Sequence, residues 1–530
     1  MVPQPPGQRP ATEIDAAQVN AALAAWRGGD RATARRSLEA VLARSPRDAQ
    51  VLSLLGRLCL ELKDTRAAIA HLDRFVAVKP DQPEAWLTLA SLVDDQSGPA
   101  AAAQRLHAGL AALPGDIGIR TNLGVLLGKA GDFAAARVEL EAALALDANP
   151  APVHFNLARL LKQTGDAAGA LTHYRRAVEI NPDFTQAQHN LGNLLLDLDR
   201  AAEAVETFRI AARLRLAARP EHEPRLFAKT SAIKLRHDIE QLRHLRAQGL
   251  LDARHDRTIA DYQSALMALP KPAPGETMVD IPAAFRAKLA PTYNRLLHWD
   301  EGAALAGPAI SPAVDFAAVE SMYRENAPGI AWFDGLLTAE ALAALRRFCL
   351  NSTIWNEFRY SNGYLGAFLD RGFACPLLHQ IARELAAAMP AIFAGHPIAK
   401  MWAFKYDSQP QVKGVGGIPI HADFAAVNVN FWITPDESNL DPEGGGLGVW
   451  DKEAPLDWDF AAYNKNEPAI RRFLKESGAK MINVPHRQNR AVMFNSDLFH
   501  ETGTLTFKDG YENRRINVTM LFGRRETSRA

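Results

Sequence analysis

A histidine and an aspartate stand two positions apart, at His421 and Asp423, in the segment GGIPIHADFAAVNVNFWITP. The segment reads as a β-strand, and in extended backbone residues i and i+2 point to the same side. The two side chains therefore converge on one face, with Ala422 on the other. A buried carboxylate without a partner is costly, so the pair predicts a group bound between them. The alternative is a buried pair that is satisfied by its own hydrogen bonds.

A third candidate ligand is His500, in the strand-like segment FNSDLFHET. Two imidazoles and one carboxylate leave positions open on an octahedral metal ion, which is the arrangement used for non-haem Fe(II) and oxygen. Zinc accepts equally few ligands, usually with tetrahedral geometry. The alternative for His500 is a hydrogen-bonded core histidine, but its placement relative to the pair favours a metal ligand.

Two adjacent arginines, Arg514 and Arg515, precede the last strand-like run, INVTMLFG. A guanidinium group is a planar and permanently charged fork that suits a carboxylate. Because successive residues of a strand face opposite sides, we expect only one arginine to face the interior. Asn517 shares a face with Arg515 and favours Arg515 for this role, with Arg514 directed outward.

The elements that must position these residues begin near Gly329. The segment GIAWFDGLLTAEALAALRRFCLNSTIW reads as a strand, a turn with Thr338 as helix N-cap, and an amphipathic helix. A second helix, PLLHQIARELAAAMPAIF, follows. Short β-type runs come next: KMWAFKYD, AVNVNFWITP, GGGLGVWD, RAVMFNSDLFHETGTLTF and RRINVTMLFG. Helices followed by short strands, with a Gly-rich turn at 444–446, predict a double-stranded β-helix (jelly roll) with flanking helices.

The C-terminal part of the chain resembles the 2-oxoglutarate- and Fe(II)-dependent dioxygenases, in the oxygenase superfamily of the prolyl hydroxylases. The resemblance rests on an H-x-D motif, a distal histidine and a downstream R-x-(S/T/N) motif: His421, Asp423, His500, Arg515 and Asn517. It implies that the first three hold Fe(II) and that Arg515, with Asn517, binds the far carboxylate of 2-oxoglutarate. It also implies O2 as a co-substrate and admits ascorbate as an accessory reductant.

The resemblance adds two residues to the co-substrate site. Tyr406 stands where many relatives place a tyrosine on the co-substrate carboxylate, although it is equally explained as an ordinary strand aromatic. Asn430 is expected to line the same pocket. Halogenating relatives replace the aspartate by Ala or Gly, so Asp423 implies hydroxylation. Collagen-type prolyl hydroxylases use lysine where this chain has Arg515, so residue specificity does not transfer.

The first half of the chain repeats itself every 34 residues. Leucines recur with this period, each followed by a small residue, at Leu55, Leu89, Leu123, Leu157 and Leu191. Alanines do the same, at Ala34, Ala68, Ala102, Ala136, Ala170 and Ala204. Prolines close repeats at Pro46, Pro80, Pro114 and Pro182, with Ala148 as an exception. The pattern predicts two helices per repeat that approach closely at the small residues and end at proline.

These units resemble the tetratricopeptide repeat, most closely in HFNLARLLKQTGDAAGALTHYRRAVEINPD at 154–183. We expect about six repeats over 14–216, forming an α-solenoid with a concave groove. By resemblance the groove holds a protein or peptide, and the alternative is a platform for self-association. Asn122, Asn156 and Asn190 also recur every 34 residues and are candidates for clamping a peptide backbone; otherwise they are exposed polar residues.

Between the two halves, residues 217–322 lose the repeat and predict charged helices that cap the solenoid, followed by a Pro-rich linker. The oxygenase-like domain is expected at 323–530, and 1–13 is expected to be a disordered N-terminus. Within the oxygenase-like domain, 452–486 is a long insertion containing one short helix. Long insertions serve as lids or binding loops, or are surface excursions without a role.

Composition describes an ordinary soluble protein. Lys+Arg and Asp+Glu are both 60, for a formal net charge of 0, which favours neither nucleic acid nor an anionic membrane as partner. Cys59, Cys349 and Cys375 are too few and too far apart for a disulfide framework. The N-terminus lacks a signal core, and no apolar run spans a bilayer. A reducing, cytoplasmic location is expected.

Together these features predict a multidomain α + β enzyme. The leading hypothesis is a dioxygenase that hydroxylates a protein or peptide side chain held by the repeats. One alternative is an oxygenase for a small molecule, with the repeats serving assembly. The other is a repeat scaffold that carries a degenerate oxygenase domain.

Overall fold

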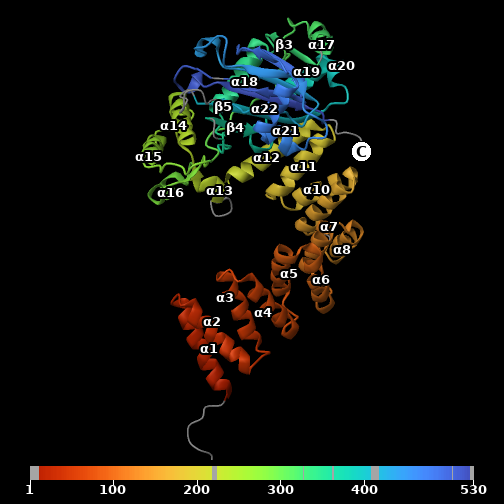
Figure 1. Cartoon of the computed structure of the whole chain (residues 1–530), viewed down its shortest axis with the longest axis vertical. Coiled ribbons are helices and arrows are strands. Elements are labelled where there is room, and N and C mark those ends of the chain that lie inside the picture. The colour runs from red at the N-terminus through yellow and green to blue at the C-terminus, as the bar shows by residue number, and fades with distance from the viewer. Residues whose placement is uncertain are drawn as a thin grey trace, which may run out of the picture. The chain divides into compact units, whose positions relative to one another are not determined.

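The structure is a computed structural model that describes residues 11–147, 149–217, 224–325, 328–360, 363–407, 417–503 and 505–525. The chain divides into two compact units, Met1–Pro182 (unit 1) and Asp183–Ala530 (unit 2) (Figure 1). Residues 1–10 of the expected disordered N-terminus lie outside the described residues, as does Ala148. Residues 11–13 already belong to the first helix.

The described residues of unit 1 form ten helices that pair in chain order as five helical hairpins. The helices are α1 (Ala11–Arg27), α2 (Arg31–Arg44), α3 (Ala49–Glu61), α4 (Thr65–Val78), α5 (Pro83–Ser97), α6 (Pro99–Ala112), α7 (Ile117–Lys129), α8 (Phe133–Leu146), α9 (Ala151–Gln163) and α10 (Ala167–Ile180). The close approach predicted at the small residues is present. A Cβ atom added to Gly124 would lie only 2.7 Å from Cγ of Leu140 in the paired helix.

Aspartates begin most of these helices, because a carboxylate at the N-cap accepts a hydrogen bond from a backbone N–H of the first turn. The capping residues are Asp30, Asp48, Asp64, Asp116, Asp132 and Asp166. Repeated leucines and alanines fill the interior between the helices, where Leu55, Leu89 and Ala136 are fully buried.

The sixth helical hairpin, α11 (Thr185–Asp197) and α12 (Ala201–Ala217), belongs to unit 2. Helix α12 contacts the 3-10 helix η1 (Leu369–Arg371) and helix α19 (Pro376–Ala388). Arg209 of α12 donates to the carbonyl oxygens of Glu301 and Ala374, and its guanidinium lies 4.9 Å from the Trp299 ring. The last repeat is therefore packed into the C-terminal unit instead of ending a separate solenoid.

The middle segment consists of short elements, and its helices α14 and α15 correspond to the two expected charged helices. The elements are α13 (Pro224–Phe227), β1 (Lys229–Thr230), α14 (Ala232–Ala247), α15 (His255–Met267), β2 (Val279–Asp280), α16 (Ala283–Leu289) and α17 (Phe316–Glu325). The middle segment was expected to cap the solenoid. Helix α14 contacts α18 (Ala339–Asn351) and η3 (Tyr511–Asn513). Trp299, also in the middle segment, packs on arginine side chains of α12.

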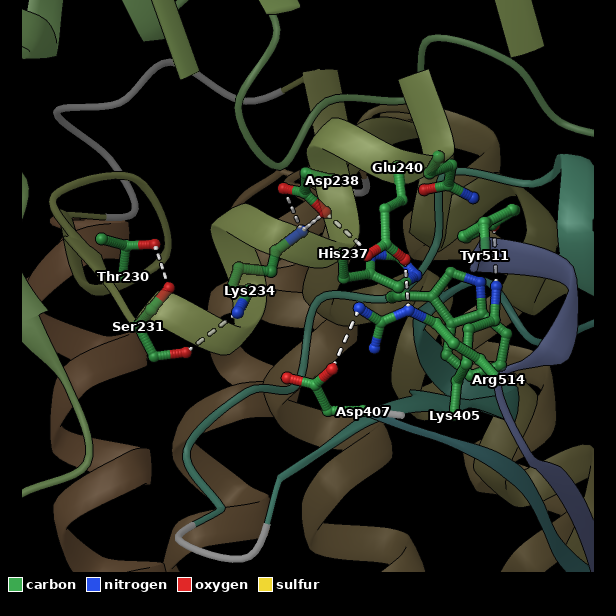
Figure 2. Close-up of polar contacts among 12 residues, drawn as sticks. Thr230, Ser231, Lys234, His237, Asp238, Glu240, Lys405, Asp407, Tyr511 and Arg514 are labelled. Carbon is green, nitrogen blue, oxygen red and sulfur yellow. Dashed lines mark hydrogen bonds and ion pairs between the residues drawn. The ribbon is translucent and has the colours of Figure 1, made fainter. Parts of the chain in front are cut away.

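Helix α14 carries buried charged side chains toward the C-terminal strands (Figure 2). Lys234 donates to both carboxylate oxygens of Asp238 at 2.7 Å, and both side chains are buried. Glu240 accepts from Arg514 at 2.7 Å. A buried ion is tolerated only when it is paired and hydrogen-bonded. The Lys234–Asp238 pair meets this need within α14, and the Arg514–Glu240 pair joins α14 to the C-terminal region.

The C-terminal region contains two antiparallel sheets. A six-stranded sheet has the order β3-β9-β6-β11-β5-β4, and a three-stranded sheet has the order β10-β7-β8. The strands are β3 (Ile330–Asp334), β4 (Tyr364–Phe368), β5 (Ile398–Tyr406), β6 (Val427–Trp432), β7 (Leu447–Glu453), β8 (Met481–Val484), β9 (Arg490–Asn495), β10 (Leu498–Glu501) and β11 (Ile516–Phe522). The strand-like run after Gly329 and the five later runs each contain a strand, although the stretch with His421 and Asp423 before β6 does not form one. Thr338 caps α18 as predicted. Strands β4 and β8 were not predicted.

Residues from both sheets share one hydrophobic core. Trp432 and Phe494 of the larger sheet and Val449 and Val484 of the smaller sheet pack in the same buried cluster. The core therefore lies between the two sheets, and the edge where β10 meets the segment before β6 is the place where the candidate ligands are found. No helix in the described ranges is both long and apolar enough for a membrane span.

Candidate metal centre

The structure brings His421, Asp423 and His500 together. One potential ligand atom from each residue lies within 4.8 Å of the others. Nε2 of His421 is 3.8 Å from Oδ1 of Asp423, and Nε2 of His500 is 3.5 Å from Oδ2 of the same carboxylate. Two nitrogen donors and a carboxylate thus face a common point, which is a donor set that Fe(II) and other divalent metals accept.

Hydrogen bonds on the far side of each ring fix both imidazoles. Nδ1 of His421 lies 2.8 Å from the carbonyl oxygen of Pro419, and Nδ1 of His500 lies 3.0 Å from that of Leu498. Because a carbonyl only accepts, Nδ1 must carry the proton in each ring. The lone pair of each imidazole is then on Nε2, directed at the common point, as a metal ligand requires.

The protonation states also suit a cation. Burial, together with the neighbouring His500, lowers the pKa of His421 to about 4, so this ring is neutral at pH 7. Burial alone would raise the pKa of Asp423, but His500, His421 and Asn428 together hold it below its usual value. Asp423 therefore carries a negative charge and His421 is a neutral nitrogen donor, which suits a cation.

The backbone that carries His421 and Asp423 does not form a regular strand, contrary to the prediction. His421 makes an isolated bridge with His500, in which each backbone N–H donates to the carbonyl of the other. The Asp423 N–H donates to the Ser496 carbonyl. The two side chains still converge because these hydrogen bonds hold the short stretch against the turn after β9 and against strand β10, which carries the third ligand.

Four polar side chains extend from Asp423 into the larger sheet. Asn428 donates to Oδ2 of Asp423 at 2.6 Å, and Asn430 donates to Asn428 at 2.6 Å. Asn517 and Thr519 both donate to Oδ1 of Asn430. Asn430 and Asn517 were expected near the site. Asn428 and Thr519 were missed, although alternation in VNVNFW places Asn428 on the same face as Asn430.

Arg515 is buried beside Tyr406, with its guanidinium carbon 4.7 Å from the tyrosine ring. Its Nε and Nη2 donate to the carbonyl oxygens of Gly445 and Gly446, in the predicted glycine-rich turn. Nη1 of Arg515 and the Tyr406 hydroxyl have no hydrogen-bond partner among the described residues. A buried guanidinium nitrogen and a buried hydroxyl thus lie side by side, and both are groups that can donate to a carboxylate.

Arg514 points to the opposite side, as the alternation predicts, but it is not exposed. Its side chain is 0% exposed and forms ion pairs with Glu240 and Asp407. The expectation that Arg514 faces outward was therefore wrong. Helix α14 covers this face of the strand, and no pattern in the sequence indicates that a helix from the middle segment lies there.

A cavity of about 20 Å³ is lined by the three candidate ligands and by two aromatic residues, Trp402 and Phe404. The four hydrogen-bonded polar side chains described above, Asn428, Asn430, Asn517 and Thr519, also line it. This volume holds about one water molecule. Arg515 and Tyr406 do not border it. Binding of a larger ligand that reaches both the cluster and Arg515 must therefore widen the cavity.

The three repeat asparagines lie on the first helices of their hairpins. The amide nitrogens of Asn122 and Asn156 donate to carbonyl oxygens of their own helices, at Gly118 and Pro152. Asn190 is half-buried on α11, in unit 2. In this structure the amide nitrogens of Asn122 and Asn156 are thus bound locally, and their role in clamping a peptide stays a prediction.

Comparisons with known proteins identify the repeats. Residues 25–92 and 158–199 match family models of the tetratricopeptide repeat. Similar solved structures include PilW, a type IV pilus biogenesis factor, with 20% identity and a TM-score of 0.30 over 37% of this chain and 90% of that chain. A thermophilic tetratricopeptide-repeat protein of Thermus thermophilus, TTC0263, has 21% identity and a TM-score of 0.25 over 34% of this chain and 99% of that chain.

YrrB, a tetratricopeptide-repeat protein with an unusual peptide-binding site, has 18% identity and a TM-score of 0.28 over 34% of this chain and 93% of that chain. No curated protein matches the chain. The matched residues fall on helical hairpins of the 34-residue period. The N-terminal part of this chain is therefore built from tetratricopeptide repeats.

Proposed function

We propose that the C-terminal region is a 2-oxoglutarate- and Fe(II)-dependent dioxygenase that hydroxylates a side chain of a protein or peptide held by the repeats. The observation that carries the proposal is the convergence of His421, Asp423 and His500, with both Nε2 atoms directed at the carboxylate. Two antiparallel sheets around a shared core are compatible with a jelly roll, the fold that this class of enzyme implies.

The residues would divide the work as follows. His421, Asp423 and His500 hold the metal, and the carbonyl groups of Pro419 and Leu498 keep the two imidazoles in the required tautomer. Asn428 orients the Asp423 carboxylate through its hydrogen bond. With 2-oxoglutarate and O2, bound Fe(II) supplies oxidation of an unactivated C–H bond, coupled to loss of CO2 from the co-substrate.

Arg515 and Tyr406 would bind the far carboxylate of the co-substrate. The unpaired Nη1 and the unpaired hydroxyl supply two donors, and the Gly445 and Gly446 carbonyls hold the guanidinium in place. Burial strengthens such a pair because water does not compete for it. Asp423 and His500 are also buried, which would limit the access of bulk water to these two metal ligands.

A polypeptide substrate is proposed because tetratricopeptide repeats in general bind proteins or peptides. The repeats and the candidate metal centre occur in one chain, so the repeats would hold the substrate and the centre would act on one of its side chains. The small-molecule alternative uses the same metal chemistry and differs only in what the repeats bind.

Succinate release tests the enzymatic proposal. The purified chain is incubated with Fe(II), 2-oxoglutarate and O2, with Asp423→Ala as the inactive control and His379→Ala, on helix α19, as a matched histidine control. We expect succinate from the wild type and His379→Ala but not from Asp423→Ala. Absence of both iron binding and succinate in the wild type would favour a repeat scaffold.

Removal of residues 1–182 then distinguishes the two enzymes. The cut is placed at Pro182 because α11 and α12 belong to unit 2. Modified lysate proteins are sought by mass spectrometry as gains of one oxygen atom after incubation with the full or shortened chain. We expect the shortened chain to release basal succinate but to lose oxidation of its polypeptide substrate. Undiminished substrate oxidation would contradict the role of the repeats.

A further inference from the structure

Ala422, the residue between the two candidate ligands, is bound by the insertion at 452–486. The insertion contains α21 (Phe460–Lys465), α22 (Glu467–Glu476) and strand β8. The Ala422 N–H donates to the carbonyl oxygen of Tyr463 at 2.9 Å, and the Asn464 amide donates to the carbonyl oxygen of Ala422 at 2.8 Å. Both backbone polar groups of this fully buried residue are therefore satisfied by two consecutive residues of α21.

The insertion is itself firmly attached behind the site. Ile470 and Leu474 of α22 are buried in a cluster that also contains Ile420 and Ala422, the residues that alternate with His421 and Asp423. The apolar face of the H-x-D segment thus packs on the insertion, while its polar face carries the ligands. Burial of such apolar side chains is strongly favourable, so the attachment is a stable part of the fold.

Charged side chains also join the insertion to neighbouring segments of the C-terminal region. Arg471 of α22 donates to Glu501, next to His500, at 2.8 Å. Arg525 lies 4.1 Å from the Tyr463 ring and donates to the carbonyl oxygens of Ala454 and Pro455. The insertion is therefore tied both to the H-x-D segment and to the strand that carries the third ligand.

We propose that the insertion positions the metal ligands, and that Asn464 is the positioning residue. The proposal rests on the metal site proposed above. The sequence suggested that this insertion is either a lid or a surface excursion. The contacts with Ala422 and Ile420 correspond to neither, because they lie on the face of the H-x-D segment opposite the ligands. The backbone of His421 is hydrogen-bonded to His500 of β10 and that of Asp423 to Ser496, whereas the backbone of Ala422 is hydrogen-bonded to α21. The peptide groups on both sides of Ala422 can rotate only if these bonds break.

Loss of the Asn464 amide leaves the Ala422 carbonyl buried without its donor, which is unfavourable unless the peptide turns toward water. Turning this peptide moves the adjacent Asp423 relative to His421. We expect the effect on metal affinity to be of the size seen when residues that orient metal ligands are lost, about 10- to 100-fold.

Cobalt(II) binding to the full-length protein tests the proposal without turnover. Co(II) is titrated against its visible absorption, and thermal unfolding of the metal-free protein is measured in parallel. The variants are Asn464→Ala and Asn464→Asp, which keeps the shape but removes the donor. Asn466→Ala is the matched control, because Asn466 caps α22 and donates nothing to Ala422.

We expect both Asn464 variants to bind Co(II) at least tenfold more weakly than the wild type. Asn464→Asp should bind Co(II) more weakly than Asn464→Ala. Asn466→Ala should lower the unfolding temperature and keep wild-type affinity. Wild-type affinity in the Asn464 variants, or an equal loss in Asn466→Ala, would overturn the positioning role. A wild-type protein that binds no Co(II) would overturn the metal site itself, and the positioning role with it.

If the Asn464 variants do not fold, hydrogen exchange measured on the wild-type protein tests the proposal instead. The amide of Ala422 should exchange as slowly as that of Val429, in the centre of the larger sheet, because its acceptor is the Tyr463 carbonyl. Exchange as fast as in exposed loops would show that the insertion does not hold the H-x-D segment, and would overturn the proposal.

Discussion

The Arg514 guanidinium donates to Oε2 of Glu240 at 2.7 Å, joining the chain just before strand β11 to helix α14 (Figure 2). Arg514 also pairs with Asp407 at 3.3 Å, and its side chain is 0% exposed. Its neighbour Arg515 points the other way, to the carbonyls of Gly445 and Gly446. The middle segment thus holds the residue that precedes the proposed co-substrate arginine.

Arg514→Ala should lower the free energy of unfolding by about 2–3 kcal/mol, instead of being neutral as an exposed arginine would be. Breaking a fully buried ion pair costs about 3–5 kcal/mol. The expected value is smaller because Asp407 keeps Arg236 as a partner and Glu240 is partly exposed. Urea unfolding measures the change. Arg524→Ala is the control, since Arg524 pairs with Asp197 while 79% exposed. Equal effects of the two substitutions would contradict the prediction.

Arg515→Ala should weaken 2-oxoglutarate binding by about ten- to a hundredfold. A charge-assisted pair contributes about 1.5–3 kcal/mol, and about 1.4 kcal/mol corresponds to a factor of ten. Arg515→Lys should recover only part of the loss, because an ammonium group cannot reproduce the planar fork. The measurement is succinate production against co-substrate concentration. Metal affinity should change little, and a comparable loss of metal binding would point to a structural role instead.

His421→Ala, Asp423→Ala and His500→Ala should each abolish stable metal binding while the fold is retained. The surrounding strands keep their apolar packing, and each substitution removes one of three donors. Metal content after dialysis and the circular dichroism spectrum report the two properties separately. His379→Ala should leave the metal content unchanged. Wild-type metal affinity in the three ligand variants would rule out this site.

A fragment of residues 183–530 should unfold cooperatively, whereas one of residues 323–530 should not form a stable domain. The shorter fragment lacks α14, which supplies Glu240 to Arg514, and α12, which packs on η1 and α19. It would expose apolar surface and leave a buried guanidinium without one partner. Calorimetry of both fragments measures whether each unfolds cooperatively. A sharp thermal unfolding transition in the shorter fragment would contradict the prediction and place the start of the domain near Tyr323.

His486→Phe should make the protein less sensitive to acid. Burial, with the charges of Arg515 and Arg490, lowers the pKa of His486 to about 3. In the unfolded chain this histidine titrates at about 6.5. Between these values the unfolded state binds a proton that the folded state does not, so stability falls as the pH drops below about 6.5 and is unaffected above it.

The contribution of His486 between pH 7 and pH 5 is about 2 kcal/mol. Phenylalanine retains the aromatic contacts with Phe507 and Trp432, and both ring nitrogens of His486 lack partners among the described residues. Urea unfolding of both proteins at the two pH values gives the difference directly. The same acid-dependent loss in His486→Phe and the wild type would assign the sensitivity to other groups.

Local patterns in the sequence predicted the repeats and most strands because each depends on residues close together in the chain. The period of 34 residues fixed the hairpins, and the Thr338 cap and the strand runs were found where expected. The three candidate ligands could be chosen because their residue types are rare in apolar strands. Asn428 was within reach of the same reasoning, since it alternates with Asn430.

Long-range packing was not predicted, because no local pattern records which helix covers which strand. Arg514 looks like a surface arginine until Glu240, far earlier in the chain, is placed beside it. The pairing of Asn464 with Ala422 likewise joins two segments with no periodic relation. The boundary between the units fell inside the repeats for the same reason: α11 and α12 have repeat sequences but pack on η1, α19 and β5.

That boundary has a consequence for how the chain can be varied. Five hairpins lie in unit 1, and the sixth is built into the C-terminal unit through contacts such as those of Arg209 with Glu301 and Ala374. The sixth hairpin therefore has the sequence of a repeat, but its surface packs on other elements of the C-terminal unit. Repeats can be added, lost or exchanged before Pro182 without cutting any of these contacts, so the number of repeats can vary while the C-terminal unit keeps its own packing.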